Sequence, residues 1–192
     1  KTVGGIILDP KTGAIFGLAV RPAFDPGKKQ SDLAPLANPL IERVYEIGSI
    51  MKPLTIAAGL DTGAVSEETY YNDTGSLSID GKVISNYDGR ARGRVPLQEI
   101  IIQSLNIGAV FVMRQLGRER FRDYLDGFGI GEKTGVDLPG EVRGLISNLA
   151  SGREIEFATA SFGQGIAVTP LNITMALSTL ANGGYLVKPQ IV

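Results

Sequence analysis

The chain has 192 residues, of which 43% are hydrophobic, enough for an ordinary globular core. Its net charge is −1, and its basic residues are scattered along the sequence, so it lacks the continuous basic face that nucleic-acid binding requires. Cysteine and histidine are absent, which excludes thiol nucleophiles, disulfides, thiolate metal sites and a histidine general base within these residues. Acid–base chemistry here would fall to Lys, Asp, Glu or Tyr.

Two β-rich runs open the chain. Residues 3–9 (VGGIILD) and 14–20 (AIFGLAV) flank Pro10-Lys11-Thr12-Gly13, whose proline and glycine suit a tight turn. We therefore predict a β-hairpin. Residues 21–39 are rich in Pro, Asp, Gly and Lys and are expected to form a surface loop.

The rest of the chain alternates helical stretches with polar segments. A helix should follow Ser49, with Pro53 tolerated in its first turn and Gly63 closing it. Residues 66–94 are turn-rich and weakly patterned. Further helices are expected at 96–103, at 107–116, at 118–126, and from Pro170 to Asn182-Gly183 with Thr169 as the N-cap. The pattern predicts one domain of mixed α and β structure.

The stretch YEIGSIMKPLTIAAGL places Ser49 and Lys52 three residues apart. On an α-helix the later residue lies about 4.5 Å further along the axis and about 60° around it, so the hydroxyl and the amine can meet on one face. Apolar neighbours would desolvate Lys52 and lower the pKa of its amine, leaving a neutral base able to take the serine proton. At the helix start, backbone N–H groups would also favour negative charge developing near Ser49. The pair therefore predicts a nucleophile and its base.

This spacing is weak evidence by itself, because Ser-x-x-Lys should occur about once by chance in a chain of this length. Ser49 could also act only as a helix cap. A second polar break adds to the case, since Ser104-Leu105-Asn106 falls between two predicted helices, where a hydroxyl and an amide could project into a site. Ser-x-x-Lys followed by a Ser-x-Asn element is typical of penicillin-binding proteins and serine β-lactamases.

The resemblance extends over nearly the whole chain. Five blocks, in the family's order, closely resemble the transpeptidase domain of class B, monofunctional penicillin-binding proteins: LDPKTGAIFGLAVRPAFDP, YEIGSIMKPLTIAAGLDTG, VPLQEIIIQSLNIGAVFVMRQLG, FGIGEKTGVDLPGE and ATASFGQGIAVTPLNITMALSTLANGGYLVKPQIV. The resemblance implies an α/β fold of the α+β type, similar to penicillin-binding proteins and serine β-lactamases, with an antiparallel sheet and helices on both of its faces. It also implies that residues 1–192 form a single, partial transpeptidase domain.

The resemblance further implies a serine-type D,D-transpeptidase that needs neither a cofactor nor a metal. Ser49 matches the acylated nucleophile, Lys52 its general base, Ser104 the serine that relays a proton to the leaving group, and Asn106 the amide that binds the substrate peptide. The implied partners are the D-Ala-D-Ala stem peptides of peptidoglycan, cross-linked by acyl transfer, and β-lactams, which would acylate the same serine. The backbone N–H of Ser49 should supply half of an oxyanion hole.

The sequence departs from the family at three motif positions. Ile47 stands where proline is usual and Met51 where phenylalanine is frequent, and neither change alters the chemistry. Lys-Thr-Gly, the third motif, occurs at Lys11-Thr12-Gly13 and Lys133-Thr134-Gly135, but both copies match family positions with structural roles.

The family's functional triplet lies on a strand beyond the KPQIV block, where this sequence ends. We therefore expect the C-terminal strands and helix to be missing, and to be supplied by the rest of the same domain or by a second chain. The 192 residues alone should acylate slowly and expose an apolar sheet edge.

Two other functions remain open. A serine β-lactamase would hydrolyse its acyl-enzyme, although ISNLASGREIEFA does not match the Glu-bearing loop of the class A type. A non-catalytic β-lactam sensor or scaffold domain would keep an acylable serine without turnover. A role in elongation, division or sporulation is equally undecided by the sequence.

The resemblance implies an extracytoplasmic location, in the periplasm or at the outer face of the cytoplasmic membrane. The residues contain neither an apolar run of about 18 residues nor a signal peptide, so we expect an N-terminal anchoring segment outside them.

Overall fold

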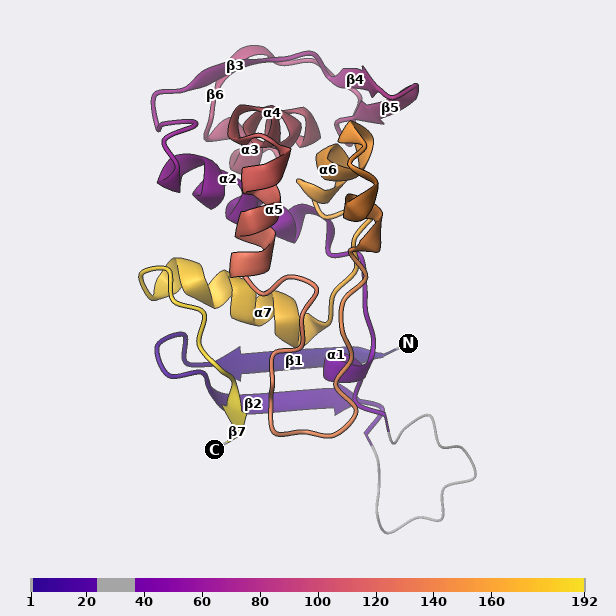
Figure 1. The fold of residues 1–192 in the computed structure, drawn as a ribbon, viewed down its shortest axis with the longest axis vertical. Coiled ribbons are helices and arrows are strands. Elements are labelled where there is room, and N and C mark those ends of the chain that lie inside the picture. The colour runs from indigo at the N-terminus through magenta and orange to yellow at the C-terminus, as the bar shows by residue number, and fades with distance from the viewer. Residues whose placement is uncertain (1, 24–36, 192) are drawn as a thin grey trace. The chain divides into compact units, whose positions relative to one another are not determined.

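The structure is a computed structural model, and residues 2–23 and 37–191 are described (Figure 1). The predicted surface loop at 21–39 falls largely on residues 24–36, which lie outside the described residues. The chain divides into two compact units. Unit 1 comprises Lys1–Tyr45, Asp126–Leu145 and Val168–Val192, and unit 2 comprises Glu46–Leu125 and Ile146–Ala167.

Unit 1 is built on the predicted hairpin. Strands β1 (Val3–Leu8) and β2 (Ala14–Arg21) pair antiparallel, with a register shift between Ile7 and Leu8. The short strand β7 (Gln190–Ile191) joins the start of β2 in parallel, so the sheet order is β1-β2-β7. The expectation of an antiparallel sheet thus holds for β1 and β2 but not for β7, because Ala14 and Ile15 pair with a segment that runs in the same direction.

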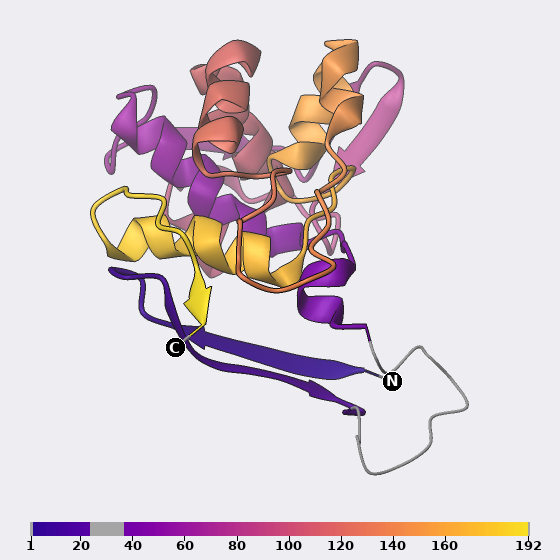
Figure 2. The ribbon, with the colours of Figure 1, turned by 60° about the horizontal axis from the view of Figure 1, so that its bottom comes forward.

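Helices α1 (Pro39–Glu42) and α7 (Pro170–Ser178) lie on the same face of this sheet (Figure 2). The core of unit 1 combines residues from both helices, the sheet and a loop: Ile15, Ile41, Val136, Leu171 and Met175. The expectation of helices on both faces does not hold for this sheet in the described residues (Figure 2), and the apolar side chains of Val3, Ile7 and Phe16 on its strands remain exposed. Thr169 caps α7 as predicted, because its side chain accepts from the backbone N–H of Asn172, and the 3-10 helix η4 (Thr179–Ala181) extends its end.

Unit 2 contains most of the helices and two strand pairs. Its elements in chain order are η2 (Gly48–Met51), α2 (Lys52–Asp61), β3 (Tyr70–Asp73), β4 (Ser76–Ile79), β5 (Lys82–Ser85), β6 (Gly93–Pro96), α3 (Glu99–Ile102), α4 (Asn106–Leu116), α5 (Arg118–Gly127, whose last two residues belong to unit 1), η3 (Ser147–Ser151) and α6 (Glu154–Ala160). Strand β3 pairs with β6, and β4 with β5, both antiparallel. Helix α4 is central, since Ala109, Val110 and Val112 are wholly buried.

The predicted helices 107–116 and 118–126 are confirmed within one residue at each end as α4 and α5. The helix predicted from Pro96 to Gln103 is wrong at its start. Residues Gly93–Pro96 form strand β6 on β3, and only Glu99–Ile102 are helical. Proline suits this place because the end of an edge strand needs no further N–H donor.

The turn-rich segment 66–94 contains a strand pair that the sequence pattern did not reveal. Asp80 and Gly81 have positive φ angles of 50° and 76° between β4 and β5, the conformation that an Asp-Gly hairpin turn adopts. Among the described residues, no helix is both long enough and apolar enough to cross a membrane.

Candidate active site

Ser49 and Lys52 meet as the sequence predicts, but in a tighter turn than expected. Ser49 lies in the 3-10 helix η2, and α2 begins at Lys52. Side chains three residues apart eclipse one another in a 3-10 turn, so this geometry brings the hydroxyl and the amine together more directly than an α-helix would. The Lys52 Nζ donates to Ser49 Oγ at 3.1 Å.

The turn that carries Ser49 is fixed by a close backbone approach. The N–H of Gly48, at φ 57°, donates to the carbonyl of Gly163 at 2.9 Å. A Cβ added to Gly163, which has φ +78°, would lie 2.2 Å from the Gly48 carbonyl oxygen. Only glycine therefore fits at 163, and the contact between Gly163 and Gly48 holds the turn that carries Ser49.

Ser104 lies on the other side of the same amine. It follows the short helix α3 and has a positive φ of 54°, which is uncommon for a residue other than glycine. The Lys52 Nζ donates to the Ser104 carbonyl at 2.6 Å and to Ser104 Oγ at 2.9 Å. Ser104 Oγ in turn donates to Ser49 Oγ at 2.8 Å. Three oxygens from the two predicted serines thus surround one lysine nitrogen.

Lys52 is 1% exposed although it carries a terminal amine. Burial disfavours the charged ammonium and lowers the pKa of Lys52 to about 8. About one amine in ten is then neutral at pH 7 and about half at pH 8, which makes Lys52 an effective proton acceptor near neutrality. The predicted direction of the pKa change, and its cause, are confirmed.

A cleft of about 760 Å³ opens over these groups. Ser49, Ser104 and Asn106 all line it, so three predicted site residues face one cavity, with the fourth, Lys52, directly behind them. The side-chain amide of Asn106 donates to the Ser85 carbonyl at 2.8 Å. The remaining wall comes from β5, α6, the segments next to them and the neighbours of Ser49 and Ser104: Gly48, Lys82, Val83, Ile84, Ser85, Tyr87, Gln103, Ile155, Glu156, Thr159, Phe162, Gln164 and Gly165.

Much of this wall was not anticipated from the sequence. Helix α6 lies in a stretch that we did not assign, although Ile155 and Ala158, and likewise Phe157 and Ala160, are buried at the three-residue spacing of a helix. The Asp80-Gly81 pair could have signalled the hairpin that brings β5 to the cleft. Glu46, next to the serine turn, accepts from the backbone N–H of Gly165 at 2.8 Å.

Neither Lys-Thr-Gly copy is among the residues that line the cleft, and both lie in unit 1. Thr12 donates to Asp9 in the hairpin turn at 2.9 Å. The backbone N–H and the hydroxyl of Thr134 both donate to Glu141 at 2.6 Å. Each threonine thus bonds a nearby carboxylate, as expected for a triplet with a structural role.

The arrangement provides an exposed hydroxyl, an adjacent buried amine, and a second hydroxyl that touches both. This constellation can deprotonate Ser49 and direct its oxygen at an electrophile bound in the cleft. Within the part of the chain that the structure describes, no group of carboxylates is placed to hold a metal ion.

Comparison with known proteins agrees with this geometry. The family model for the "Penicillin binding protein transpeptidase domain" matches residues 3–192, and the chain belongs to that family. The chain is 35% identical over 189 residues to the stage V sporulation protein D of Bacillus subtilis, covering 97% of this chain and 29% of that protein. It is 31% identical over 211 residues to the peptidoglycan D,D-transpeptidase MrdA of Acinetobacter baumannii, covering 97% and 31%.

Solved structures give the same result. The crystal structure of penicillin-binding protein 3 of Mycobacterium tuberculosis in complex with aztreonam has a TM-score of 0.88 and 30% identity, covering all of this chain and 43% of that chain. The fold class, mixed α and β of the penicillin-binding protein type, is therefore confirmed. The chain spans less than a third of the length of the two curated relatives named here.

Proposed function

We propose that the chain carries the serine machinery of a peptidoglycan D,D-transpeptidase. The observation that carries the proposal is the three-way contact of Ser49 Oγ, Lys52 Nζ and Ser104 Oγ at the floor of a cleft that Asn106 also lines. The family of the chain and the names of relatives such as MrdA support the same reaction.

In the proposed reaction, neutral Lys52 takes the proton of Ser49, and Ser49 Oγ attacks the carbonyl between the two terminal D-alanines of a stem peptide. The Ser49 ester forms as the peptide bond breaks. The departing D-alanine amine receives the proton from Lys52 through the Ser104 hydroxyl, which contacts both Lys52 Nζ and Ser49 Oγ. An amine of a neighbouring stem peptide then attacks the ester, forms the cross-link and returns the proton to Ser49 through the same groups.

Asn106 is proposed to bind the substrate peptide from the wall of the cleft, and β-lactams are proposed to acylate Ser49 in place of the peptide. The structures of penicillin-binding protein 3 of Mycobacterium tuberculosis in complex with aztreonam and with ampicillin support the β-lactam part of this proposal. Because peptidoglycan is assembled outside the cytoplasm, we also infer an extracytoplasmic site of action. We retain residues 1–192 as part of one transpeptidase domain.

The test is acylation of the complete gene product that contains these residues by a fluorescent penicillin. We expect stoichiometric labelling that peptide mapping assigns to Ser49 and that Ser49→Ala abolishes. Labelling of another residue, or labelling that survives in Ser49→Ala, would refute the assignment.

The alternative functions differ in the fate of the acyl-enzyme. Rapid release of the penicilloyl group would identify a β-lactamase, whereas a transpeptidase or a sensor should release it slowly. Transfer of a stem-peptide acyl group to an added D-amino acid would then distinguish the transpeptidase, since a sensor or scaffold domain performs no transfer.

A further inference from the structure

Helix α4 begins at Asn106, two residues after Ser104, and its N-cap side chain makes no capping hydrogen bond. The N-cap position of α4 is Leu105, whose side chain cannot accept a hydrogen bond. The first N–H groups of a helix have no partner within the helix and are normally bonded by a polar N-cap side chain. Here the partner comes from another part of the chain, because Asn86 Oδ1 accepts from the backbone N–H of Ile107 at 3.2 Å.

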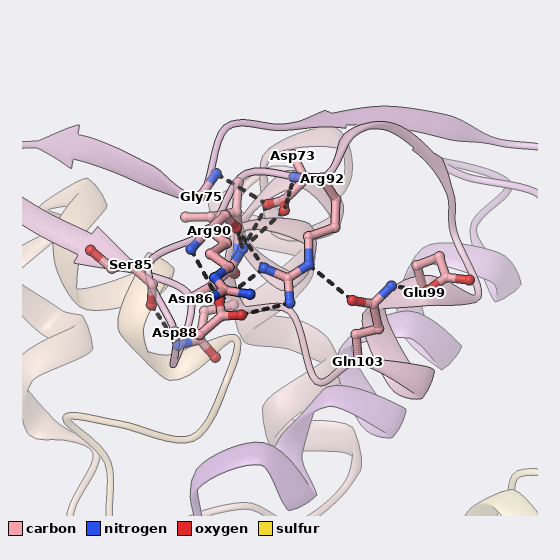
Figure 3. Close-up of polar contacts among 11 residues, drawn as sticks. Asp73, Gly75, Ser85, Asn86, Asp88, Arg90, Arg92, Glu99 and Gln103 are labelled. Atoms are coloured by element: carbon pink, nitrogen blue, oxygen red, sulfur yellow. Dashed lines mark hydrogen bonds and ion pairs between the residues drawn. The ribbon is translucent and has the colours of Figure 1, made fainter.

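Asn86 is itself held by a buried carboxylate. Asp73 is 0% exposed and Asn86 is 4% exposed. The Asn86 amide nitrogen donates to Asp73 Oδ1 at 2.9 Å and to Oδ2 at 3.0 Å, as Figure 3 shows. The backbone N–H of Arg92 also donates to Asp73 Oδ2 at 3.0 Å. These contacts fix the amide with its oxygen directed at Ile107.

Two residues close to Asn86 in the sequence, Ser85 and Arg92, contact Asn106 and the residue before Ser104. Ser85, adjacent to Asn86, accepts the side-chain amide of Asn106 at 2.8 Å. The Arg92 Nε donates to Gln103 Oε1 at 2.9 Å (Figure 3). The polar network thus contacts residues on both sides of Ser104, whose left-handed backbone must be maintained by its surroundings.

We propose that Asn86 is a positioning residue for Ser104 and Asn106: by bonding Asp73 and the N–H of Ile107, it sets the start of α4 and so the placement of both side chains in the cleft. The inference rests on the proposed function for its kinetic consequence, but not for its structural one. Catalytic geometry is sensitive to such placement, and a shift of about 1 Å can cost about 10²-fold in rate.

The test uses Asn86→Asp in the complete gene product. An ionised aspartate has nearly the same shape but cannot donate to Asp73, so at a pH where both carboxyl groups are ionised they repel each other and the oxygen moves away from Ile107. We expect the first-order rate constant of Ser49 acylation by a fluorescent penicillin to fall by about 10²-fold, with the dissociation constant of the initial complex nearly unchanged.

The reciprocal variant Asp73→Asn with Asn86→Asp supplies the rescue. It restores a donor at 73 and an acceptor at 86 and keeps the same net charge, so acylation should return to within a few-fold of the wild-type rate. Asn72→Asp, the same change at the exposed neighbour of Asp73, is the matched control and should acylate as the wild type does.

Two further measurements keep the inference testable if Asn86→Asp does not fold or if the wild-type protein does not react with penicillin. If Asn86→Asp does not fold, Asn86→Ser keeps a donor near Asp73 but is too short to reach Ile107, and it should fold and acylate about tenfold more slowly. Hydrogen exchange of the peptide containing residues 104–107 should be faster in Asn86→Asp and restored in the reciprocal variant, whether or not Ser49 reacts with penicillin. Unchanged exchange, or wild-type acylation by Asn86→Asp, would overturn the inference, whereas an unreactive wild-type protein would overturn only the proposed function.

Discussion

The two sides of the cleft are held in different ways. On the Ser49 side, a 3-10 turn and the backbone contact between Gly48 and Gly163 set the geometry, and Lys52 follows three residues later. On the Ser104 side, the backbone is strained and is placed by side chains from a distant segment, chiefly Asn86 and Arg92. The first side depends on local backbone geometry, and the second on long-range polar contacts.

The largest effect should come from Lys52, which touches both sides. Lys52→Met removes the base and should lower the rate of Ser49 acylation by about 10² to 10⁴-fold. The variant should still fold, because methionine suits a buried position and removes the cost of burying an amine. Fluorescent penicillin labelling and thermal unfolding at pH 7 measure the two effects.

Lys133→Met is the matched control for this change. Lys133 begins one of the Lys-Thr-Gly triplets and is exposed, and it is not among the residues that line the cleft. Ser49 in the Lys133→Met variant should be acylated at the wild-type rate. A loss as large as that of Lys52→Met would show that the triplet takes part in the reaction.

The next effect concerns the Ser49 side. Gly163→Ala would place a Cβ against the Gly48 carbonyl in addition to straining a left-handed backbone, and should cost about 3 kcal/mol of unfolding free energy or more. Gly63→Ala has a similar φ of +68° but no atom within 4 Å of the added Cβ, so it should cost only about 1 kcal/mol. Denaturant unfolding compares the two. Equal losses would mean that the contact with Gly48 is unimportant.

A pH profile tests the buried amine that joins the two sides. Because burial lowers the pKa of Lys52 to about 8, the acylation rate should rise about fivefold from pH 7 to pH 8 and level off above it. Stopped-flow acylation between pH 6 and 10 provides the measurement. A rate that is flat from pH 6 to 9 would contradict a neutral-lysine base.

The same pKa change has a consequence for stability. Between pH 8 and 10.5, the folded state has already released the Lys52 proton while the unfolded state still binds it. The contribution of Lys52 to the unfolding free energy therefore rises with pH across that window. The Lys52→Met variant should lack this contribution when the two unfolding curves are compared.

The smallest effect should come from the exposed rim of the Ser104 side. Arg92 pairs with Asp88 at 2.9 Å and lowers the pKa of that carboxyl to about 2, while its Nε bonds Gln103. Arg92→Gln should slow acylation only about two- to threefold, because exposed ion pairs are screened by water and salt. A loss as large as that of Asn86→Asp would place the control of Ser104 at Arg92 instead.

The same division separates the features that could be predicted from those that could not. The Ser49–Lys52 contact and helices α4 and α5 depend on neighbours in the sequence, so spacing and capping signals were enough to predict them. The pairing of β3 with β6 and the contact of Asn86 with Ile107 join residues far apart in sequence, and no local pattern marks such partners. Pro96 was misassigned for that reason, since its place on β6 is set by pairing with Tyr70.

The backbone of Ser104 carries a consequence for the choice of residue there. A φ of 54° suits glycine, so a serine at this position adds backbone strain in the folded state and supplies a hydroxyl that glycine lacks. Ser104→Gly should relax the chain and be more stable than Ser104→Ala by about 1 kcal/mol, yet both should lose the hydroxyl-dependent step equally. The residue that would make the fold most stable at position 104 is therefore not the one that the reaction needs. Comparing Ser104→Gly with Ser104→Ala measures the backbone strain separately from the loss of the hydroxyl.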